Sequence, residues 1–254
     1  MTSILRPLAA AAVGLFLAIS LPAFAQTISP GQRQEIEAII KDYLVKNPEV
    51  LQEALGALEK HQAAAEAAKH QAAVKDNAAA LFNSKRQVVI GNPQGDVTLV
   101  EFFDYNCGYC KGAVADMLGL MKADPKLRVV LKEFPVLGEG SVEAARVAVA
   151  VRMQDTGKKY LEFHQKLFGN RGAVGREQAL AAAKSAGFDM GRLEKDMASD
   201  EPKATLEESF KLAEALGLTG TPSYVIGYEV VSGAIGLTNL QEKVNAARCG
   251  KPAC

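Results

Sequence analysis

The stretch that decides the fold is VTLVEFFDYNCGYCK, which runs from Val97 to Lys111. Its first seven residues are almost continuously apolar, which is typical of a central strand covered on both faces of a sheet. A helical pattern follows directly, with apolar residues at Ala113, Met117, Leu118 and Met121. The pair Cys107-x-x-Cys110 therefore lies where a buried strand turns into a helix.

The position of this cysteine pair predicts redox chemistry. Free backbone N–H groups and the positive end of a helix dipole favour a thiolate at Cys107, and Lys111 adds positive charge. The two-residue gap lets the sulfur of Cys110 approach the first sulfur, so the pair can close a disulfide or resolve a mixed disulfide. We expect Cys107 to attack the substrate and Cys110 to resolve the intermediate.

Other uses of two neighbouring cysteines compete with this interpretation. A zinc site needs two further ligands at close spacing, whereas the histidines of the chain are distant in sequence, at His61, His70 and His164. A plain structural disulfide rarely uses a two-residue gap at a strand-to-helix turn. A copper(I) site made of two soft thiolates is chemically reasonable and stays open as an alternative.

The rest of the second half predicts an α/β domain around this turn. Four short apolar runs predict further strands, at 87–90, 127–134, 223–226 and 228–231. Residues 141–216 are almost entirely helical in pattern, and Thr238-Asn239-Leu240-Gln241 is a capping box that predicts the start of a last helix. Residues 81–254 are therefore predicted to form one domain with a helical insertion at about 138–216.

The segment before this domain is predicted to be a helical arm at 26–80. Ser29-Pro30-Gly31-Gln32 is a helix start with a capping box, and Asn47-Pro48 ends that helix and caps the next one. An apolar stripe follows both helices, at Ile36, Ile39, Ile40, Tyr43 and Leu44, then at Leu51, Ala54, Leu55 and Leu58. Ten of the twenty residues from 61 to 80 are Ala, which makes a helix-prone linker with little to bury. We expect the stripe to associate with copies of itself rather than to fold back.

Residues 1–25 indicate the compartment. They carry one charge, Arg6, then an apolar run and the sequence Ala23-Phe24-Ala25, which is the pattern of a cleaved secretory signal peptide; a membrane anchor is the alternative. No later segment is apolar enough to span a bilayer. The 29 basic and 29 acidic residues give a formal charge of zero, which argues against nucleic acid or an anionic membrane as a partner. We expect an exported protein in an oxidising compartment.

Two motifs together resemble the DsbA-like branch of the thioredoxin superfamily. They are Phe102 to Lys111, and Gly220-Thr221-Pro222-Ser223 more than a hundred residues later. The N-terminal helices, with Asp42-Tyr43-Leu44 and the stretch from Asn47 to Leu55, look like those of ScsC (suppressor of copper sensitivity C) and Com1-type members. The resemblance implies a thioredoxin fold with an inserted helical domain, preceded by an N-terminal helical oligomerisation arm.

The resemblance also implies roles for single residues. Cys107 would be the nucleophile and Cys110 the resolving thiol, and together they would form the redox-active disulfide. Thr221-Pro222 would be a cis peptide that faces the cysteines and binds substrate, with Tyr109 beside it. Glu101 would be the buried acid beneath the pair, with a raised pKa and a share in proton transfer.

The same resemblance favours a disulfide isomerase or reductase. Gly108-Tyr109 replaces the Pro-His of the best-known oxidases of this branch, and Thr221 before the proline resembles isomerases and reductases. The implied protein is periplasmic and forms homo-oligomers, trimers included. It uses no cofactor and no metal, acts on proteins with thiols or disulfides, and has a membrane-bound redox partner. The alternatives are a monomeric dithiol oxidase and a copper-binding or copper-delivery protein that uses the same thiols.

The remaining cysteines and the residues beside the motif are expected to have structural roles. Cys249 and Cys254 flank a short tail, and in an oxidising compartment we expect them to pair with each other or to stay as mobile thiols. Asp104 and Tyr105 are expected to line the cleft rather than to carry protons.

Overall fold

A computed structural model describes residues 29–254 of the chain. The predicted signal peptide, residues 1–25, lies outside the described residues. The chain divides into two compact units, 1–58 and 59–254, and each is described by itself.

The first unit holds helix α1 (Pro30–Lys46) and the start of helix α2 (Pro48–Asp76). The predicted capping box is confirmed, because the Ser29 side chain accepts from the Gln32 N–H and the Gln32 side chain accepts from the Ser29 N–H. Asn47 was predicted to cap the second helix, but its side-chain amide donates to the Tyr43 carbonyl and so caps the end of α1. Helix α1 contains no buried residue.

The second unit is built on a mixed five-stranded sheet with the order β1-β3-β2-β4-β5. The strands are β1 (Val88–Gly91), β2 (Val97–Phe103), β3 (Leu127–Glu133), β4 (Ser223–Ile226) and β5 (Glu229–Ser232). Strand β2 has the predicted bounds. It is a central strand, because it pairs with β3 and β4 and is buried along almost its whole length. Strand β5 lies at the edge of the sheet.

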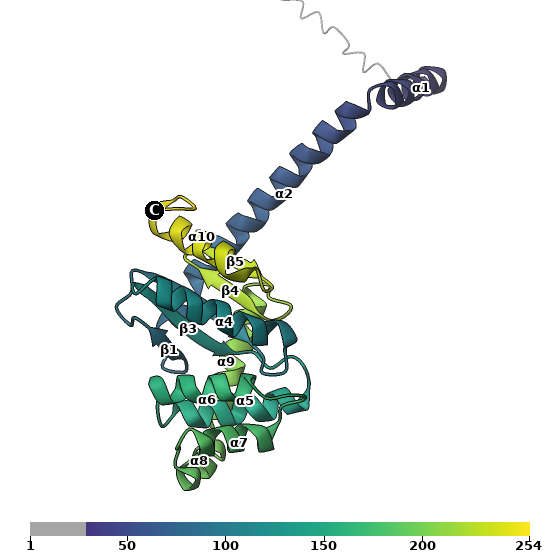
Figure 1. The fold of residues 1–254 in the computed structure, drawn as a ribbon. Coiled ribbons are helices and arrows are strands. Elements are labelled where there is room, and N and C mark those ends of the chain that lie inside the picture. Colours follow the sequence, from purple (N-terminus) through teal and green to yellow (C-terminus); the bar gives the residue numbers. More distant parts are fainter. Residues whose placement is uncertain (1–28) are drawn as a thin grey trace, which may run out of the picture. The chain divides into compact units, whose positions relative to one another are not determined.

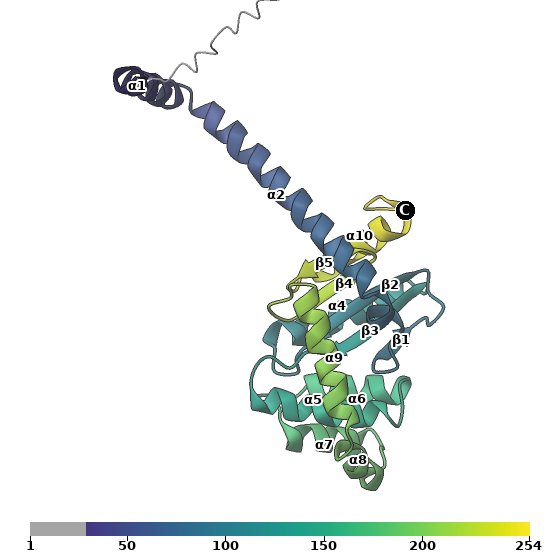
Figure 2. The ribbon, with the colours of Figure 1, turned by 180° about the vertical axis from the view of Figure 1, so that it is seen from behind.

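Helices cover both faces of this sheet. Helices α4 (Gly108–Ala123) and α10 (Gly236–Cys249) lie on one face, and α9 (Glu201–Ala215) lies on the other (Figures 1 and 2). The first face packs with Leu99, Phe103 and Ile226, whereas Val100 and Phe102 belong to the second core cluster. Alternate residues of β2 therefore point into different cores, which is why the strand is apolar throughout.

The predicted helical block consists of separate helices between β3 and β4. They are α5 (Glu139–Arg152), α6 (Lys158–Phe168), α7 (Arg176–Ser185) and α8 (Met190–Met197), followed by α9. Helices α5 to α8 lie together at one end of the sheet (Figure 1). Helix α3 (Ala78–Asn83) precedes β1, and its Leu81 is fully buried in the second core cluster.

The start of the last helix differs from the prediction. Helix α10 begins at Gly236, so the expected capping box at Thr238 lies inside its first turn, and the Asn239 side chain donates to the Ile235 carbonyl instead. Within residues 29–254, no helix is long and apolar enough to cross a membrane.

Candidate functional site

Cys107 occupies the N-cap of α4, where buried strand β2 passes into the helix. Its sulfur accepts a hydrogen bond from the Cys110 N–H at 3.4 Å. Its thiol donates to the backbone carbonyl of Thr221 at 3.1 Å. Two segments that are 114 residues apart in sequence therefore meet at one sulfur.

Cys110 lies in the first turn of α4 and is completely buried, whereas Cys107 keeps a small exposed fraction. Both cysteines are free thiols. Burial raises the pKa of the Cys110 thiol well above its usual value. Cys107 is therefore the sulfur that a substrate can reach, and Cys110 needs a base nearby before it can act as a nucleophile.

Glu101 supplies a carboxyl group on the buried side of this motif. It lies in the middle of β2 with 2% of its surface exposed, so it does not face a solvent gap. Burial raises its pKa from 4.5 to about 8. The raised pKa agrees with the expectation for an acid inside an apolar strand, and an acid with a pKa in this range can exchange a proton near neutral pH.

The Thr221-Pro222 peptide bond is cis, as the resemblance implied. Pro222 is buried and directly precedes β4, which pairs with β2. Tyr109, between the two cysteines, is 75% exposed. The structure thus brings Cys107, Cys110, Thr221 and Pro222 to one place, with the Tyr109 side chain projecting from it.

Asp104 and Tyr105 do not line a cleft, contrary to the prediction, because each is only 1% exposed. The Asp104 carboxylate accepts three hydrogen bonds, from the N–H groups of Asn106, Val136 and Leu137 at 2.8 to 2.9 Å. The Tyr105 hydroxyl lies 3.0 Å from Nδ1 of the buried His164 in α6. Both side chains fix the loop before Cys107 rather than face solvent.

Asn106 is a structural residue that the sequence reasoning missed. Its side chain accepts from the Val174 N–H at 2.7 Å, and donates to the Val174 carbonyl at 2.8 Å and to Ser141 Oγ at 2.9 Å. Lys111 makes a parallel link, since its ammonium donates to the Asn170 carbonyl at 3.0 Å. These contacts fasten the cysteine loop to the helical insertion. The only signal in the sequence is an Asn directly before Cys107.

Exposed apolar side chains occur within the motif and on the loop bonded to it. Tyr109 is exposed between the cysteines, and Val136 and Leu137, which are 39% and 54% exposed, donate their backbone N–H groups to the Asp104 carboxylate. Exposed apolar groups beside a reactive thiol suit contact with an unfolded polypeptide.

The other two cysteines lie at the end of α10. Cys249 and Cys254 form a disulfide with each other at the end of α10, which confirms the first of the two expected outcomes. Among the described residues, no group of three or more His, Cys, Asp or Glu side chains is arranged to hold a metal ion.

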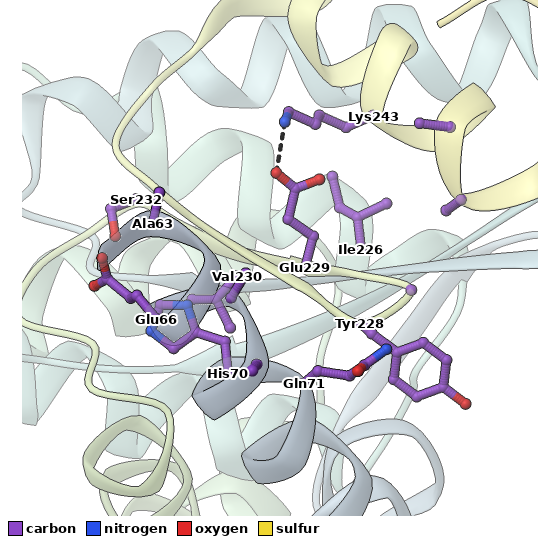
Figure 3. A pocket seen from close by; sticks show the side chains of 15 residues that line it. Ala63, Glu66, His70, Gln71, Ile226, Tyr228, Glu229, Val230, Ser232 and Lys243 are labelled. Carbon is purple, nitrogen blue, oxygen red and sulfur yellow. Dashed lines mark hydrogen bonds and ion pairs between the residues drawn. The ribbon is translucent and has the colours of Figure 1, made fainter. Parts of the chain in front are cut away.

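A cavity of about 890 Å³ lies elsewhere, between α2, the edge strand β5 and α10 (Figure 3). Glu66 and His70 line it from α2, and an ion pair of Glu229 with Lys243 lies at its opposite side. It contains no cysteine, and it is an open crevice along the sheet edge. The chemistry of the thiols therefore locates the candidate site better than cavity size does.

Comparisons with known proteins match both parts of the chain. A family model described as "DSBA-like thioredoxin domain" matches residues 98–245, and one described as "Copper resistance protein ScsC N-terminal domain" matches residues 32–65. A thioredoxin-like oxidoreductase from Silicibacter pomeroyi is 45% identical, with a TM-score of 0.64 over 67% of this chain and 96% of that one. A linker-deletion mutant of Proteus mirabilis ScsC is 29% identical, with a TM-score of 0.66 over 88% of this chain and 98% of that one.

One curated relative is much longer than the part that this chain matches. The Na(+)/H(+) antiporter NhaA of Herminiimonas arsenicoxydans is 28% identical over 162 residues, which are 63% of this chain and 25% of that protein. The chain thus spans about a quarter of the length of this antiporter. The family model covers more than half of the chain, and the Silicibacter pomeroyi structure is covered almost completely. The chain belongs to the DsbA-like thioredoxin family.

Proposed function

We propose that this protein is a thiol-disulfide oxidoreductase that acts in the periplasm as a disulfide isomerase or reductase. The observation that carries the proposal is the contact of Cys107 Sγ with the Thr221 carbonyl at the N-terminus of α4, above the buried Cys110. A reactive sulfur, a resolving sulfur and an adjacent extended backbone are the parts that this chemistry needs.

The proposed reaction begins when the Cys107 thiolate attacks a substrate disulfide. One new S–S bond forms to Cys107, and the substrate's S–S bond breaks to release a substrate thiolate. In isomerisation, a second substrate thiol attacks this mixed disulfide and frees Cys107. In reduction, Cys110 gives its proton to the Glu101 carboxylate and attacks Cys107, which closes the Cys107–Cys110 disulfide and releases the reduced substrate.

The surrounding residues are proposed to hold the substrate. The backbone next to Thr221 and Pro222 would pair with an extended chain, and the exposed ring of Tyr109 would pack on its side chains. The oxidised Cys107–Cys110 pair would be returned to the dithiol by a membrane-bound thiol reductant, which supplies the two electrons that the substrate receives.

The arm is proposed to bring several catalytic units together. Apolar side chains of residues 29–58 are largely exposed in the single chain, at Ile36, Ile39, Ile40, Tyr43, Val45, Leu51, Leu55 and Leu58. Self-association would remove this apolar surface from water and is the expected use of the stripe. Several thiolates on one assembly would let a misfolded client engage repeatedly without leaving.

The experiment that tests this function combines two measurements on the mature protein. Refolding of a client with scrambled disulfides should be accelerated, and trapping of thiols in living cells should recover Cys107 and Cys110 mainly as the dithiol. Cys107→Ser should abolish the acceleration. If the pair is recovered entirely as a disulfide and the protein shows no shuffling activity, the protein is a dithiol oxidase and not an isomerase.

Copper binding is a second candidate, because the structure presents two unpaired thiols and the arm matches a family named for copper resistance. Two soft thiolates favour Cu(I). Titration with Cu(I) at a physiological concentration of competing thiol should then give one ion per chain, lost in both Cys107→Ser and Cys110→Ser. Binding that survives either substitution would place the copper elsewhere.

A further inference from the structure

Tyr224 is a buried residue of β4 to which neither the sequence nor the proposed reaction gives a role. It is 1% exposed, and it follows Pro222 by two residues. Among the described residues, no group forms a hydrogen bond with its hydroxyl. A buried hydroxyl without a partner costs free energy that a phenylalanine would not, so the hydroxyl at this position calls for an explanation.

The strand register places Tyr224 directly beside Glu101. Glu101 of β2 pairs with Tyr224 of β4 on one side and with Leu131 of β3 on the other. Residues paired in this way point to the same face of the sheet, with their Cβ atoms about 5 Å apart. Because Leu131 is apolar, Tyr224 is the polar cross-strand neighbour of the buried acid.

This face of the sheet is the one that α4 and the cysteines cover. Tyr224, Cys107 and Cys110 belong to the same core cluster. Burial raises the pKa of Tyr224 first, and negative charge on Glu101, Cys110, Asp116 and Cys107 raises it further. The hydroxyl is therefore a neutral hydrogen-bond donor at working pH.

Apart from the thiols of α4, the described elements on this face contribute apolar side chains and one further acid. Helix α10 turns the apolar side chains of Leu240 and Val244 toward the sheet. Asp116 of α4, whose charge also raises the pKa of Tyr224, is half-buried. When ionised, its carboxylate can accept a hydrogen bond but cannot donate one.

We propose that Tyr224 is a positioning residue, whose hydroxyl donates a hydrogen bond through one water molecule to the ionised Glu101 carboxylate. The inference rests on the proposed function, in which that carboxylate takes the proton of Cys110. A donor directed at the charged form of an acid stabilises that form and lowers its pKa. Tyr224 thus offsets part of the rise that burial imposes on the pKa of Glu101.

The step affected is the release of a mixed disulfide. The proton moves from the Cys110 thiol to Glu101, the Cys110 sulfur bonds to Cys107, and the bond from Cys107 to the substrate sulfur breaks. In this step the Cys110 sulfur is oxidised into the disulfide and the substrate sulfur is reduced to a thiolate, which takes a proton from solvent. Over attack and release together, the enzyme dithiol gives two electrons to the substrate disulfide. Without the Tyr224 hydroxyl, Glu101 ionises at a higher pH, and fewer molecules hold a competent base at neutral pH.

The test is Tyr224→Phe, which keeps the ring and removes only the hydroxyl. Reduced full-length mature protein is mixed with oxidised glutathione between pH 6 and pH 9.5, and acid-quenched samples are counted by mass spectrometry as mixed disulfide or closed disulfide. Relative to wild type, the midpoint of the release step should move up by about one pH unit, with a three- to tenfold slower release near pH 7. Alkylation of Cys107 in a Cys110→Ser background should be unchanged.

Two controls separate this role from a structural one. Tyr105→Phe removes another buried tyrosine hydroxyl, bonded to His164, and should leave the midpoint in place even where stability falls. Glu101→Gln should remove the base, and adding Tyr224→Phe to it should change nothing further. Superimposed pH profiles for wild type and Tyr224→Phe overturn the inference. A wild-type protein that never forms the mixed disulfide overturns the proposed function instead.

Discussion

The two units of this chain differ in whether their apolar side chains are exposed or buried. In residues 29–58, the isoleucine, leucine and tyrosine side chains of the apolar stripe are 43% to 67% exposed except for Leu44, which is half-buried, and α1 has no buried residue. In residues 59–254, strands and helices enclose two core clusters. The catalytic unit carries its own core, whereas the arm has regular helices with nothing to stabilise their apolar side within one chain.

The exposed apolar stripe marks the arm as the part of the protein that depends on a partner. Helices gain most of their stability in proteins from packing an apolar face, and an isolated short helix is marginal in water. The arm is therefore the part whose structure should respond to assembly, and the cysteine site should not. A substitution in one unit should therefore leave the structure and activity of the other unit unchanged unless the arm assembles the catalytic units.

The largest effect is expected from breaking the apolar stripe with Ile39→Glu and Leu55→Glu together. Both side chains are more than half exposed, so the single chain tolerates the change. Charges in a buried interface are strongly unfavourable, so light scattering should find monomers, and catalysis of disulfide shuffling should fall about tenfold or more while simple reduction persists.

The matched control puts acids on the opposite side of the same helices, with Gln34→Glu and Lys60→Glu. Mass and shuffling should stay as in wild type. Substitution is a cleaner test than deletion of the arm up to residue 80, because that deletion would remove Val74, which is fully buried in the core of the catalytic unit. Monomeric wild-type protein with full shuffling activity would contradict the role of the arm.

A second effect, of a few kcal/mol, is expected from Glu101→Gln in the catalytic unit. The folded pKa of Glu101 is about 8 against 4.5 for the free group, so between these values the folded chain binds a proton that the unfolded chain has lost. The contribution of Glu101 to wild-type stability should therefore fall as pH rises from about 4.5 to about 8, and the variant should lack this contribution.

Urea denaturation at pH 5 and at pH 8 measures this difference. The gain of Glu101→Gln over wild type should grow with pH within the window and stay constant above it. Burial lowers the pKa of His164 from 6.5 to about 3, so His164 adds the opposite slope between these values. This slope is the same in wild type and variant and cancels in their difference. A difference between variant and wild type that is independent of pH would mean that Glu101 ionises normally.

Asn106→Ala should cost about 2 kcal/mol, since it leaves the Val174 N–H and carbonyl without their side-chain partner. Hydrogen exchange should rise in residues 169–175 and around Cys107, but the mass of the assembly should not change. Asn170→Ala is the control, because Asn170 contributes its backbone carbonyl and not its side chain to the link with Lys111. Equal hydrogen exchange in the two variants would show that the Asn106 side chain does not stabilise the contact between the cysteine loop and the helical insertion.

Much of the fold could be predicted because local patterns fix it. Strand β2 has its predicted bounds, since a strand buried on both faces must be apolar at every position. The capping box at Ser29 and Gln32 formed for the same kind of reason, because both hydrogen bonds are made within four residues. The cis Thr221-Pro222 bond was predicted by resemblance and not by local physics.

The contacts that position the site could not be read in this way. Glu101 and Tyr224 are neighbours only through the register of two strands more than a hundred residues apart. Tyr105 and His164 meet across 59 residues, so a residue that looked solvent-facing is buried against the insertion. Sequence periodicity predicts which side of an element is buried, but not which element covers it.

The smallest effect is expected from opening the tail disulfide with Cys249→Ser and Cys254→Ser. Both cysteines are exposed, and the bridge closes a short loop after the last turn of α10. A disulfide stabilises by restricting the unfolded chain more than the folded one. Without its bridge, the tail beyond Gly250 would gain almost the same freedom in both states, so thermal unfolding should change by less than about 0.5 kcal/mol. Assembly, glutathione reactivity and shuffling should all match wild type. If shuffling is lost while the arm and Cys107 are intact, the tail takes part in the reaction and does not have a purely structural role.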